Sequence, residues 1–212
     1  MTLVGDPTFA SGAVSTILSW LIALGGATAI GIVLGLAIGS SPALQAIGMP
    51  IVEFLRPLPS VALIPLAISV FGIDAETKIV LAVFAATWPI LMNTIYAFEA
   101  VDAEQLEVAR CFRVSRRRQL TGVVLPSIGP FVLTGVRISA SIALIALVAT
   151  EFLAGGSVGI GQYANVWGAA GGRMDVVLAV TTVAGLLGCG INAAFLALQR
   201  KWMPWSAGED AL

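Results

Sequence analysis

The chain alternates long apolar runs with short polar stretches. Four of these runs are about 20 residues or longer, and a shorter, proline-punctuated run lies between the first two of them. A membrane-spanning helix needs about 20 mostly apolar residues, because its backbone must satisfy its own hydrogen bonds in hydrocarbon. The pattern therefore predicts five transmembrane helices, at about residues 13–38, 61–73, 79–98, 128–153 and 176–198.

The run at 61–73 is the weakest of the five predictions. It is short, it is entered through Pro57 and Pro59, and Pro65 interrupts it, so it either tilts little or is partly irregular. The first run carries no charge, is too long for the apolar core of a signal peptide and has no basic segment before it. We expect it to remain in the mature protein.

The composition favours a membrane protein. Of the 212 residues, 58% are hydrophobic and 11% are charged, and the mean hydropathy is +0.97. A soluble domain is about a quarter charged, so this chain lacks the polar surface that would cover a globule. We expect a single all-α transmembrane domain over residues 1–212. The net charge of -1 gives no general attraction for nucleic acid.

The residue inventory argues against chemistry within the chain. Histidine is absent, which removes histidine-based triads, metal sites and proton shuttles. Cys111 and Cys189 are too far apart in sequence to suggest a thiolate cluster. Residues 155–159 fit the G-x-S-x-G motif of serine hydrolases, but they follow a predicted membrane helix and have no histidine base. No phosphate-binding G-x-x-x-x-G-K-[ST] loop is present. We expect no catalytic residue, metal or cofactor here, and ATP and Mg only on a partner.

Counting lysines and arginines sets the predicted orientation. With five spans, the loops after the first and third spans share one side with the C-terminus, and that side carries eight basic residues against two on the other. We therefore expect the C-terminus in the cytoplasm and the N-terminus outside. If 61–73 is not a span, the N-terminus moves to the cytoplasm. The eight are Arg56, Arg110, Arg113, Arg116, Arg117, Arg118, Arg200 and Lys201, and the two are Lys78 and Arg173.

Polar residues inside the predicted spans are costly in lipid and mark candidate functional positions. Asn93 follows a Trp88-Pro89 break, and it either bonds a neighbouring helix or lines a polar pathway. Arg137 requires an ionic or carbonyl partner, and a structural role is favoured over substrate contact. Glu151 faces either the glycine-rich stretch that follows it or a water-filled cavity.

Two glycine patterns predict unusual structure. Gly31, Gly35 and Gly39 recur at four-residue spacing and form a groove for close helix approach, with packing inside the chain favoured over a dimer seam. The stretch 155–172 is the expected outer-mouth or re-entrant element, and an unstructured outer loop is the alternative. The candidate pathway or gate residues are Pro59, Pro65, Asn93, Arg137, Glu151, Gly159 and Gly161.

The polar stretch at about 102–126 holds the densest charge in the chain. Acidic residues near its start favour a short helix, and Leu106, Ala109 and Phe112 give that helix a narrow apolar stripe. A second short helix follows, and Pro126 then opens the fourth span. The stretch is either a solvated loop that obeys the positive-inside rule or a docking element for a cytosolic partner.

This stretch resembles the "EAA" loop in the inner-membrane permeases of binding-protein-dependent ABC importers. Glu107, Ala109, Val123, Leu125 and Pro126 match that pattern in register. Further segments are similar to the nitrate/sulfonate/taurine-type branch of the family, in the same order. These segments are residues 54–66, 71–73, 89–94, 135–137, 151 and 159–161.

The resemblance implies a type I importer permease that pairs as a homodimer or a heterodimer, binds two cytosolic ATPase subunits and receives solute from an extracytoplasmic binding protein. The EAA loop would be the helix that couples to the ATPase. Two positions depart from the pattern: Val108 replaces an alanine, and Arg113 replaces a glycine that takes a left-handed turn. The implied coupling residues are Glu104, Glu107, Ala109, Arg110, Phe112, Arg113, Leu125 and Pro126.

Other functions remain open at this point. A stand-alone secondary transporter or channel would need its own coupling residues and usually an internal repeat, and no convincing repeat is present. An intramembrane enzyme lacks histidine and a closely spaced acid pair. For an importer, a small anion such as a sulfonate or nitrate is the expected solute, while vitamin precursors and aromatic acids are alternatives.

Overall fold

The computed structural model describes residues 6–99, 101, 107–109 and 111–203, and the regular structure in this part of the chain is helical. Four helices are long and apolar enough to cross a membrane, or five if one bent pair of helices counts as a span. The elements are α1 (Pro7–Gly39), α2 (Pro42–Leu55), η2 (Ser60–Leu63), α3 (Ile64–Phe71), α4 (Ala75–Glu99), α6 (Arg116–Gln119), η3 (Leu120–Val124), α7 (Leu125–Ala154), α8 (Ile160–Tyr163), η4 (Ala164–Ala169) and α9 (Met174–Trp202).

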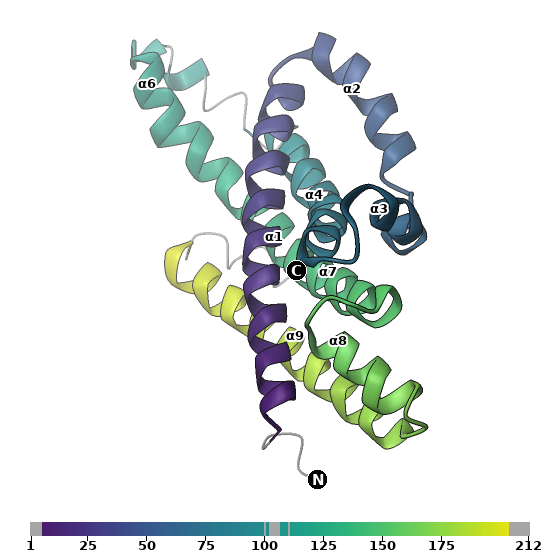
Figure 1. The fold of residues 1–212 in the computed structure, drawn as a ribbon. Coiled ribbons are helices and arrows are strands. Elements are labelled where there is room, and N and C mark those ends of the chain that lie inside the picture. The colour runs from purple at the N-terminus through teal and green to yellow at the C-terminus, as the bar shows by residue number, and fades with distance from the viewer. Residues whose placement is uncertain (1–5, 100, 102–106, 110, 204–212) are drawn as a thin grey trace.

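The centre of the bundle is formed by α1, α4 and α7 (Figure 1). Small side chains let these helices approach closely: Ala23, Ala82 and Ala146 share one core cluster, and Ala27, Ala86 and Ala143 share the next. Small residues at helix contacts are the usual way for membrane helices to gain packing energy, because lipid offers them no hydrophobic drive to associate.

The glycine groove of α1 is filled by α4 of the same chain. A Cβ added at Gly31 would lie 2.8 Å from Ile90, and one added at Gly35 would lie 2.5 Å from the Cβ of Thr94. A larger residue at either position would push α4 away. The glycine spacing therefore serves packing inside the chain, as favoured from the sequence.

The second predicted span differs from the observed structure. The segment before it is not a loop but the helix α2, which begins at Pro42 and ends at Leu55. After the Arg56-Pro57-Leu58-Pro59 connection the chain continues as η2 and α3, bent by 78° from α2. A proline cannot donate a backbone hydrogen bond and restricts the residue before it, so this connection breaks the helix. The prediction of five spans is therefore confirmed for four, and the fifth is a bent pair.

The remaining spans agree with the sequence analysis and run longer than predicted. The fourth is part of a helix from Arg117 to Ala154, because α6, the π-helical η3 and α7 follow one another directly. The last predicted span corresponds to α9. Only 11% of the most apolar stretch of this helix is buried, and the helix packs mainly against α7 and η4.

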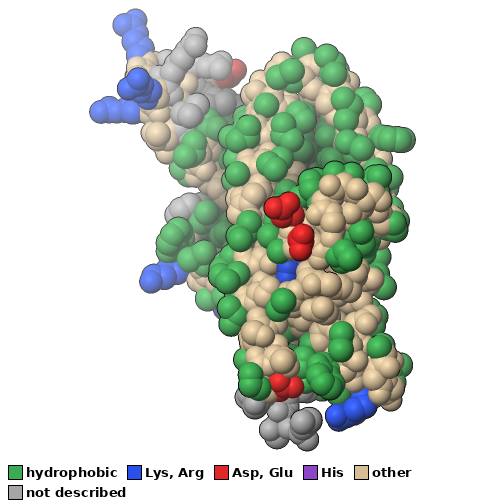
Figure 2. All heavy atoms as spheres, viewed as in Figure 1, with side chains coloured by type: hydrophobic (Ala, Val, Ile, Leu, Met, Phe, Trp, Pro, Cys, Tyr) green, Lys and Arg blue, Asp and Glu red, His purple; other side chains and the backbone are tan. Residues whose placement is uncertain are grey.

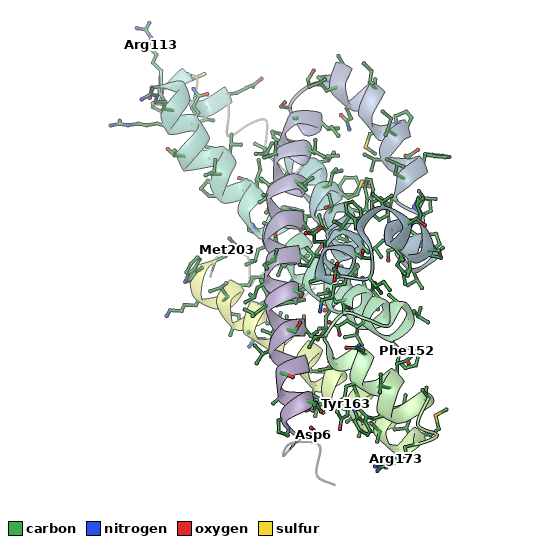
Figure 3. The ribbon with its side chains drawn as sticks, in the orientation of Figure 1. Asp6, Arg113, Phe152, Tyr163, Arg173 and Met203 are labelled. Atoms are coloured by element: carbon green, nitrogen blue, oxygen red, sulfur yellow. The ribbon has the colours of Figure 1, made fainter. Side chains whose placement is uncertain are left out.

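The two ends of the molecule differ in chemistry. Lys and Arg side chains gather over α6 at one end of the bundle (Figure 2). Arg113 lies at that end, whereas Asp6, Tyr163 and Arg173 lie at the other (Figure 3). Much of the surface between them is hydrophobic, including exposed Leu18, Ile145 and Leu186, as lipid-facing helices require.

Candidate functional site

A buried ion pair joins α4 to α7. Lys78 Nζ lies 2.8 Å from Glu151 Oε1, and the two side chains are 1% and 0% exposed. Removing a charge from water is costly unless a partner and further hydrogen bonds compensate for the lost hydration. A fully buried pair in a membrane protein therefore marks a position with a specific structural or functional demand.

Hydrogen bonds from three other segments complete this pair. The Thr16 hydroxyl of α1 lies 2.9 and 3.0 Å from the two Glu151 oxygens, and the Gly161 N–H donates to Glu151 Oε2 at 3.1 Å. Lys78 Nζ donates to the Val158 carbonyl at 2.7 Å and to Ser15 Oγ at 3.2 Å. We call Lys78, Glu151, Thr16, Ser15 and these backbone groups of 158 and 161 the ion-pair cluster.

Two glycines allow the loop after α7 to reach the ion-pair cluster. A Cβ on Gly159 would overlap the Glu151 carboxylate, and a Cβ on Gly161 would overlap the Val148 carbonyl. Both glycines are buried, and Gly159 has extended backbone (φ 178°), so space and not conformation requires glycine here. The structure thus brings together Glu151, Gly159 and Gly161, three of the seven candidate pathway or gate residues.

The sequence analysis missed Thr16, Ser15 and Lys78 of this cluster. Lys78 was counted as an outer loop charge, but it is buried in the first turns of α4. The signal was present: a buried acid requires a cation, and Lys78 is the lysine predicted on the same side of the membrane as Glu151. The ammonium group bonds Ser15, not Ser157 of the G-x-S-x-G match.

The glycine-rich stretch is a structured element. Its short helix α8 and the π-helical η4 bury Ile160 and Ala164 in a cluster with Phe9, Val176 and Val180. The alternative of an unstructured outer loop is therefore wrong for 160–169. Asn165 Nδ2 donates to the Phe152 carbonyl at 2.8 Å, which fastens this element to the end of α7.

Asp6 links the start of α1 to α8. Its carboxylate accepts hydrogen bonds from the Thr8 N–H at 2.9 Å and from Tyr163 Oη at 2.8 Å. Bonds from Thr8 foremost, and then from Tyr163, lower the pKa of Asp6 from its ordinary value. Burial, followed by the bond to Asp6, raises the pKa of Tyr163. Both shifts favour the charged Asp6 and the neutral Tyr163 that this contact needs.

A cavity of about 630 Å³ lies between the bend after α2, the middle of α4 and the middle of α7. Pro59 and Asn93 line it, so two of the predicted pathway residues meet here. Pro65 and Arg137 do not line it, and neither do the three residues at the ion-pair cluster. Pro65 lies in the first turn of α3, and Arg137 is half-buried on α7 with no hydrogen bond or ion pair to any described residue.

The arginine-rich loop is described in part. Glu104 and Arg110 lie outside the described residues. Arg113 has a positive φ of 52°, and the Val114 N–H bonds the Ala109 carbonyl at 3.0 Å, which is the six-to-one bond of a left-handed helix end. The left-handed turn that the family's glycine would take is therefore present here with an arginine, where a glycine is preferred.

An exposed aromatic side chain adjoins this turn. Phe112 is 79% exposed, Leu125 at the start of α7 is 57% exposed, and Ala109 is buried. Glu107 is exposed and Pro126 is half-buried. An aromatic ring that projects into water next to several arginines is typical of a surface that binds another protein.

Comparison with known proteins assigns the chain to a family. Residues 27–203 match the family described as "Binding-protein-dependent transport system inner membrane component". The chain belongs to this family. The taurine transport system permease protein TauC of Escherichia coli is 35% identical over 188 residues, which cover 87% of this chain and 66% of that protein.

Two further relatives are named for other solutes. The nitrate import permease protein NrtB of Leptolyngbya laminosa is 34% identical over 165 residues, which cover 77% of this chain and 58% of that protein. A bicarbonate transport system permease protein of Synechococcus elongatus is 32% identical over 179 residues, or 84% of this chain and 63% of that protein. The chain thus spans less than two thirds of the length of these two relatives.

Solved structures share the fold at low sequence identity. A MetNI methionine ABC transporter in an inward-facing conformation matches with a TM-score of 0.79 and 19% identity, covering 95% of this chain and 99% of that chain. An amino acid ABC transporter matches with a TM-score of 0.74 and 14% identity, covering 92% and 94%. The chain therefore shares the helical fold of these ABC transporter chains.

Proposed function

We propose that this chain forms the solute pathway of an ABC importer and is driven by a separate cytosolic ATPase. The observation that carries the proposal is the arginine-rich turn at Arg113, which presents Phe112 at one end of a family-typical helix bundle. The chain has no ATP-binding loop of its own, so the energy must arrive through such a contact.

Coupling requires a rigid path from the ATPase to the pathway helices. Residues 117–154 form one long helix, so a push on the loop moves the segment that carries Ile138 and Glu151. Packed helices shift as units between discrete arrangements. Glu107, Ala109, Phe112, Arg113, Leu125 and Pro126 are the described coupling residues of this proposal, together with Glu104 and Arg110.

The partners of the proposed importer are two ATPase subunits, an extracytoplasmic binding protein, and a second permease that is a copy of this chain or a different one. The arginine-rich end faces the cytoplasm of a bacterial inner membrane, and the N-terminus lies outside. Cys111 is exposed at that end. A membrane-impermeant thiol reagent should therefore label it in inverted vesicles and not in intact cells, in a Cys189→Ser background.

The ion-pair cluster is the proposed outer gate. It fixes the glycine-rich element against α1, α4 and α7 through Glu151, so the mouth keeps its shape until the bundle shifts. A valine at Gly159 or Gly161 should block uptake without releasing the ATPase, because the change lies at the opposite end from the coupling loop.

The proposed solute is a small anion. The relatives named above are taurine, nitrate and bicarbonate permeases, and the cavity beside the bend is lined by an arginine. A vitamin precursor or an aromatic acid is the alternative. Equilibrium binding of these solutes to the partner binding protein distinguishes them.

A stand-alone transporter would use an intramembrane acid to couple an ion gradient. Within the described spans, the buried acid Glu151 is already neutralised by Lys78. The ion-pair cluster therefore favours a passive conduit over an ion-coupled carrier.

Removal of residues 104–112 tests the coupling proposal. The deletion should abolish co-purification of the ATPase subunit while the chain still inserts in the membrane. Phe112→Ala should weaken co-purification in the same way, and Phe54→Ala should not, although Phe54 is 73% exposed, close to the 79% of Phe112. Unchanged association in the deletion variant would show that the loop is not the coupling element.

A further inference from the structure

The cavity at the helix bend reaches half-way along the membrane-spanning helices. Its α4 lining comes from one face, because Ala85, Trp88, Met92 and Tyr96 recur at three- and four-residue spacing. Trp88 lies near the middle of the 24-residue span 75–98. The α7 lining, Ile138 and Ile142, lies near the middle of that helix. Solute sites of transporters lie at this depth.

Arg56 brings a positive charge to this depth. It ends α2 at the bend, its side chain is exposed, and it lines both this cavity and an adjoining one of about 480 Å³. Glu53 lines the adjoining cavity, but Arg56 forms no ion pair with any described residue. An arginine in this part of a span is costly, so it marks a solute or ion pathway.

The bend explains why this charge escaped the sequence analysis. Arg56 was placed in a cytoplasmic loop because 42–55 was not recognised as a helix. With α2 present, Arg56 falls inside the bent pair that counts as one span. Val52, one turn earlier, is buried against Leu91, Met92 and Ile95 of α4, which fixes the bend beside the cavity.

The other walls suit a small molecule with an apolar body. Trp88 and Tyr96 offer aromatic surfaces, and Leu58, Ile138 and Ile142 offer aliphatic ones. Asn93 Nδ2 donates to the Pro89 carbonyl at 2.8 Å, which fixes the amide against α4 and leaves its oxygen as an acceptor. Pro89 also lacks the N–H that would bond the Ala85 carbonyl on the same wall.

We propose that this cavity is a transit site for a small organic anion, such as an alkylsulfonate, whose charged group pairs with the Arg56 guanidinium. Its apolar body then lies against Trp88 and the α7 isoleucines. A guanidinium matches the oxygens of a sulfonate or carboxylate in a two-pronged geometry. The inference rests on the proposed pathway function and adds to it the residue that selects the charge.

The charge of the cavity can be measured without transport. In a Cys111→Ser/Cys189→Ser background, Ile138→Cys places a thiol in the cavity wall, at a position that is 43% exposed. Its reaction rates with a sulfonate-bearing and a trimethylammonium-bearing methanethiosulfonate are compared. Arg56→Gln should lower the anion-to-cation rate ratio by about tenfold, because a unit charge a few ångströms away acts strongly in a low-dielectric site.

Cys111 supplies the matched control. In a chain that retains Cys111 and carries Cys189→Ser, the same rate ratio should be unaffected by Arg56→Gln, since Cys111 lies in the loop at the end of the bundle. An unchanged ratio at the introduced thiol would overturn the proposal. A thiol that reacts with neither reagent would also overturn it, because the cavity would then be closed to solutes.

Protection separates a binding site from a merely charged surface. Millimolar ethanesulfonate should slow the reaction of the introduced thiol with neutral methyl methanethiosulfonate, and Arg56→Gln should remove this protection. Equal protection in both backgrounds, or in neither, would contradict the site. Co-purification of the ATPase with the Arg56→Gln chain reports separately on the proposed function, so the two failures are distinguishable.

Discussion

At the residue scale, Arg113 holds a left-handed backbone conformation at the turn between two short helices. A side chain with a Cβ is strained there, whereas glycine is not. The sequence match to the EAA pattern located this turn, and the φ of 52° agrees with it. The arginine therefore retains the turn at a cost in stability.

Arg113→Gly should raise the free energy of unfolding by about 0.5–1 kcal/mol, because relief of the strain outweighs the extra freedom of the unfolded chain. Arg117→Gly, inside the helical segment 116–119, should instead lower it by about 1 kcal/mol. Denaturant unfolding in detergent micelles measures both. Equal losses for the two variants would show that Arg113 is not strained.

Also at the residue scale, the buried charges of Lys78 and Glu151 stabilise each other. Lys78→Met leaves a buried carboxylate, and Glu151→Gln leaves a buried ammonium, so each should cost about 3–5 kcal/mol of stability. The double variant has no unpaired charge and should be more stable than the sum of the single losses predicts. A double-mutant cycle of unfolding free energies tests this, and strict additivity would contradict the ion pair.

At the element scale, sequence patterns predicted the helices well and their breaks poorly. Apolar runs longer than 20 residues leave few alternatives to a spanning helix, so α1, α4, α7 and α9 were found. The residues of α2 form an apolar segment that was left between the first two predicted spans, although they are helical with Pro50 inside the helix. Only packing against α1 and α4 shows that the segment is helical.

The candidate site was likewise predicted in part. Glu151, Gly159 and Gly161 are close in sequence, so a local pattern could group them. Lys78 is distant in sequence from all three, and its partnership depends on how α4 packs against α7. Long-range pairs of this kind are not encoded in any local spacing.

The glycine-rich element gives a further prediction. Gly159→Ala should lower stability by about 1–3 kcal/mol, because its Cβ would overlap the Glu151 carboxylate. Gly185→Ala is the matched control: nothing lies within 4 Å of the added Cβ, and helical α9 should be stabilised by about 0.5–1 kcal/mol. Thermal unfolding of the purified variants measures both, and a harmless Gly159→Ala would contradict the close approach.

At the scale of the whole molecule, the two ends differ. Arg113 of the arginine-rich turn lies at one end, and Asp6 and Arg173 lie at the other (Figure 3). The ion-pair cluster contacts α1 at Ser15 and Thr16, in the half of that helix that begins next to Asp6. The long helix from 117 to 154 runs from the turn to Glu151. A force applied at one end can therefore reach the proposed gate at the other through this helix.

Solute uptake into proteoliposomes distinguishes a pathway driven by a separate ATPase from a transporter that works alone. The chain assembled with its ATPase and binding protein should take up solute only when ATP is present on the ATPase side, and removal of residues 104–112 should abolish this uptake. The chain reconstituted alone should accumulate nothing, with or without an ion gradient. Accumulation by the chain alone, or ATP-driven uptake that survives the deletion, would contradict the account.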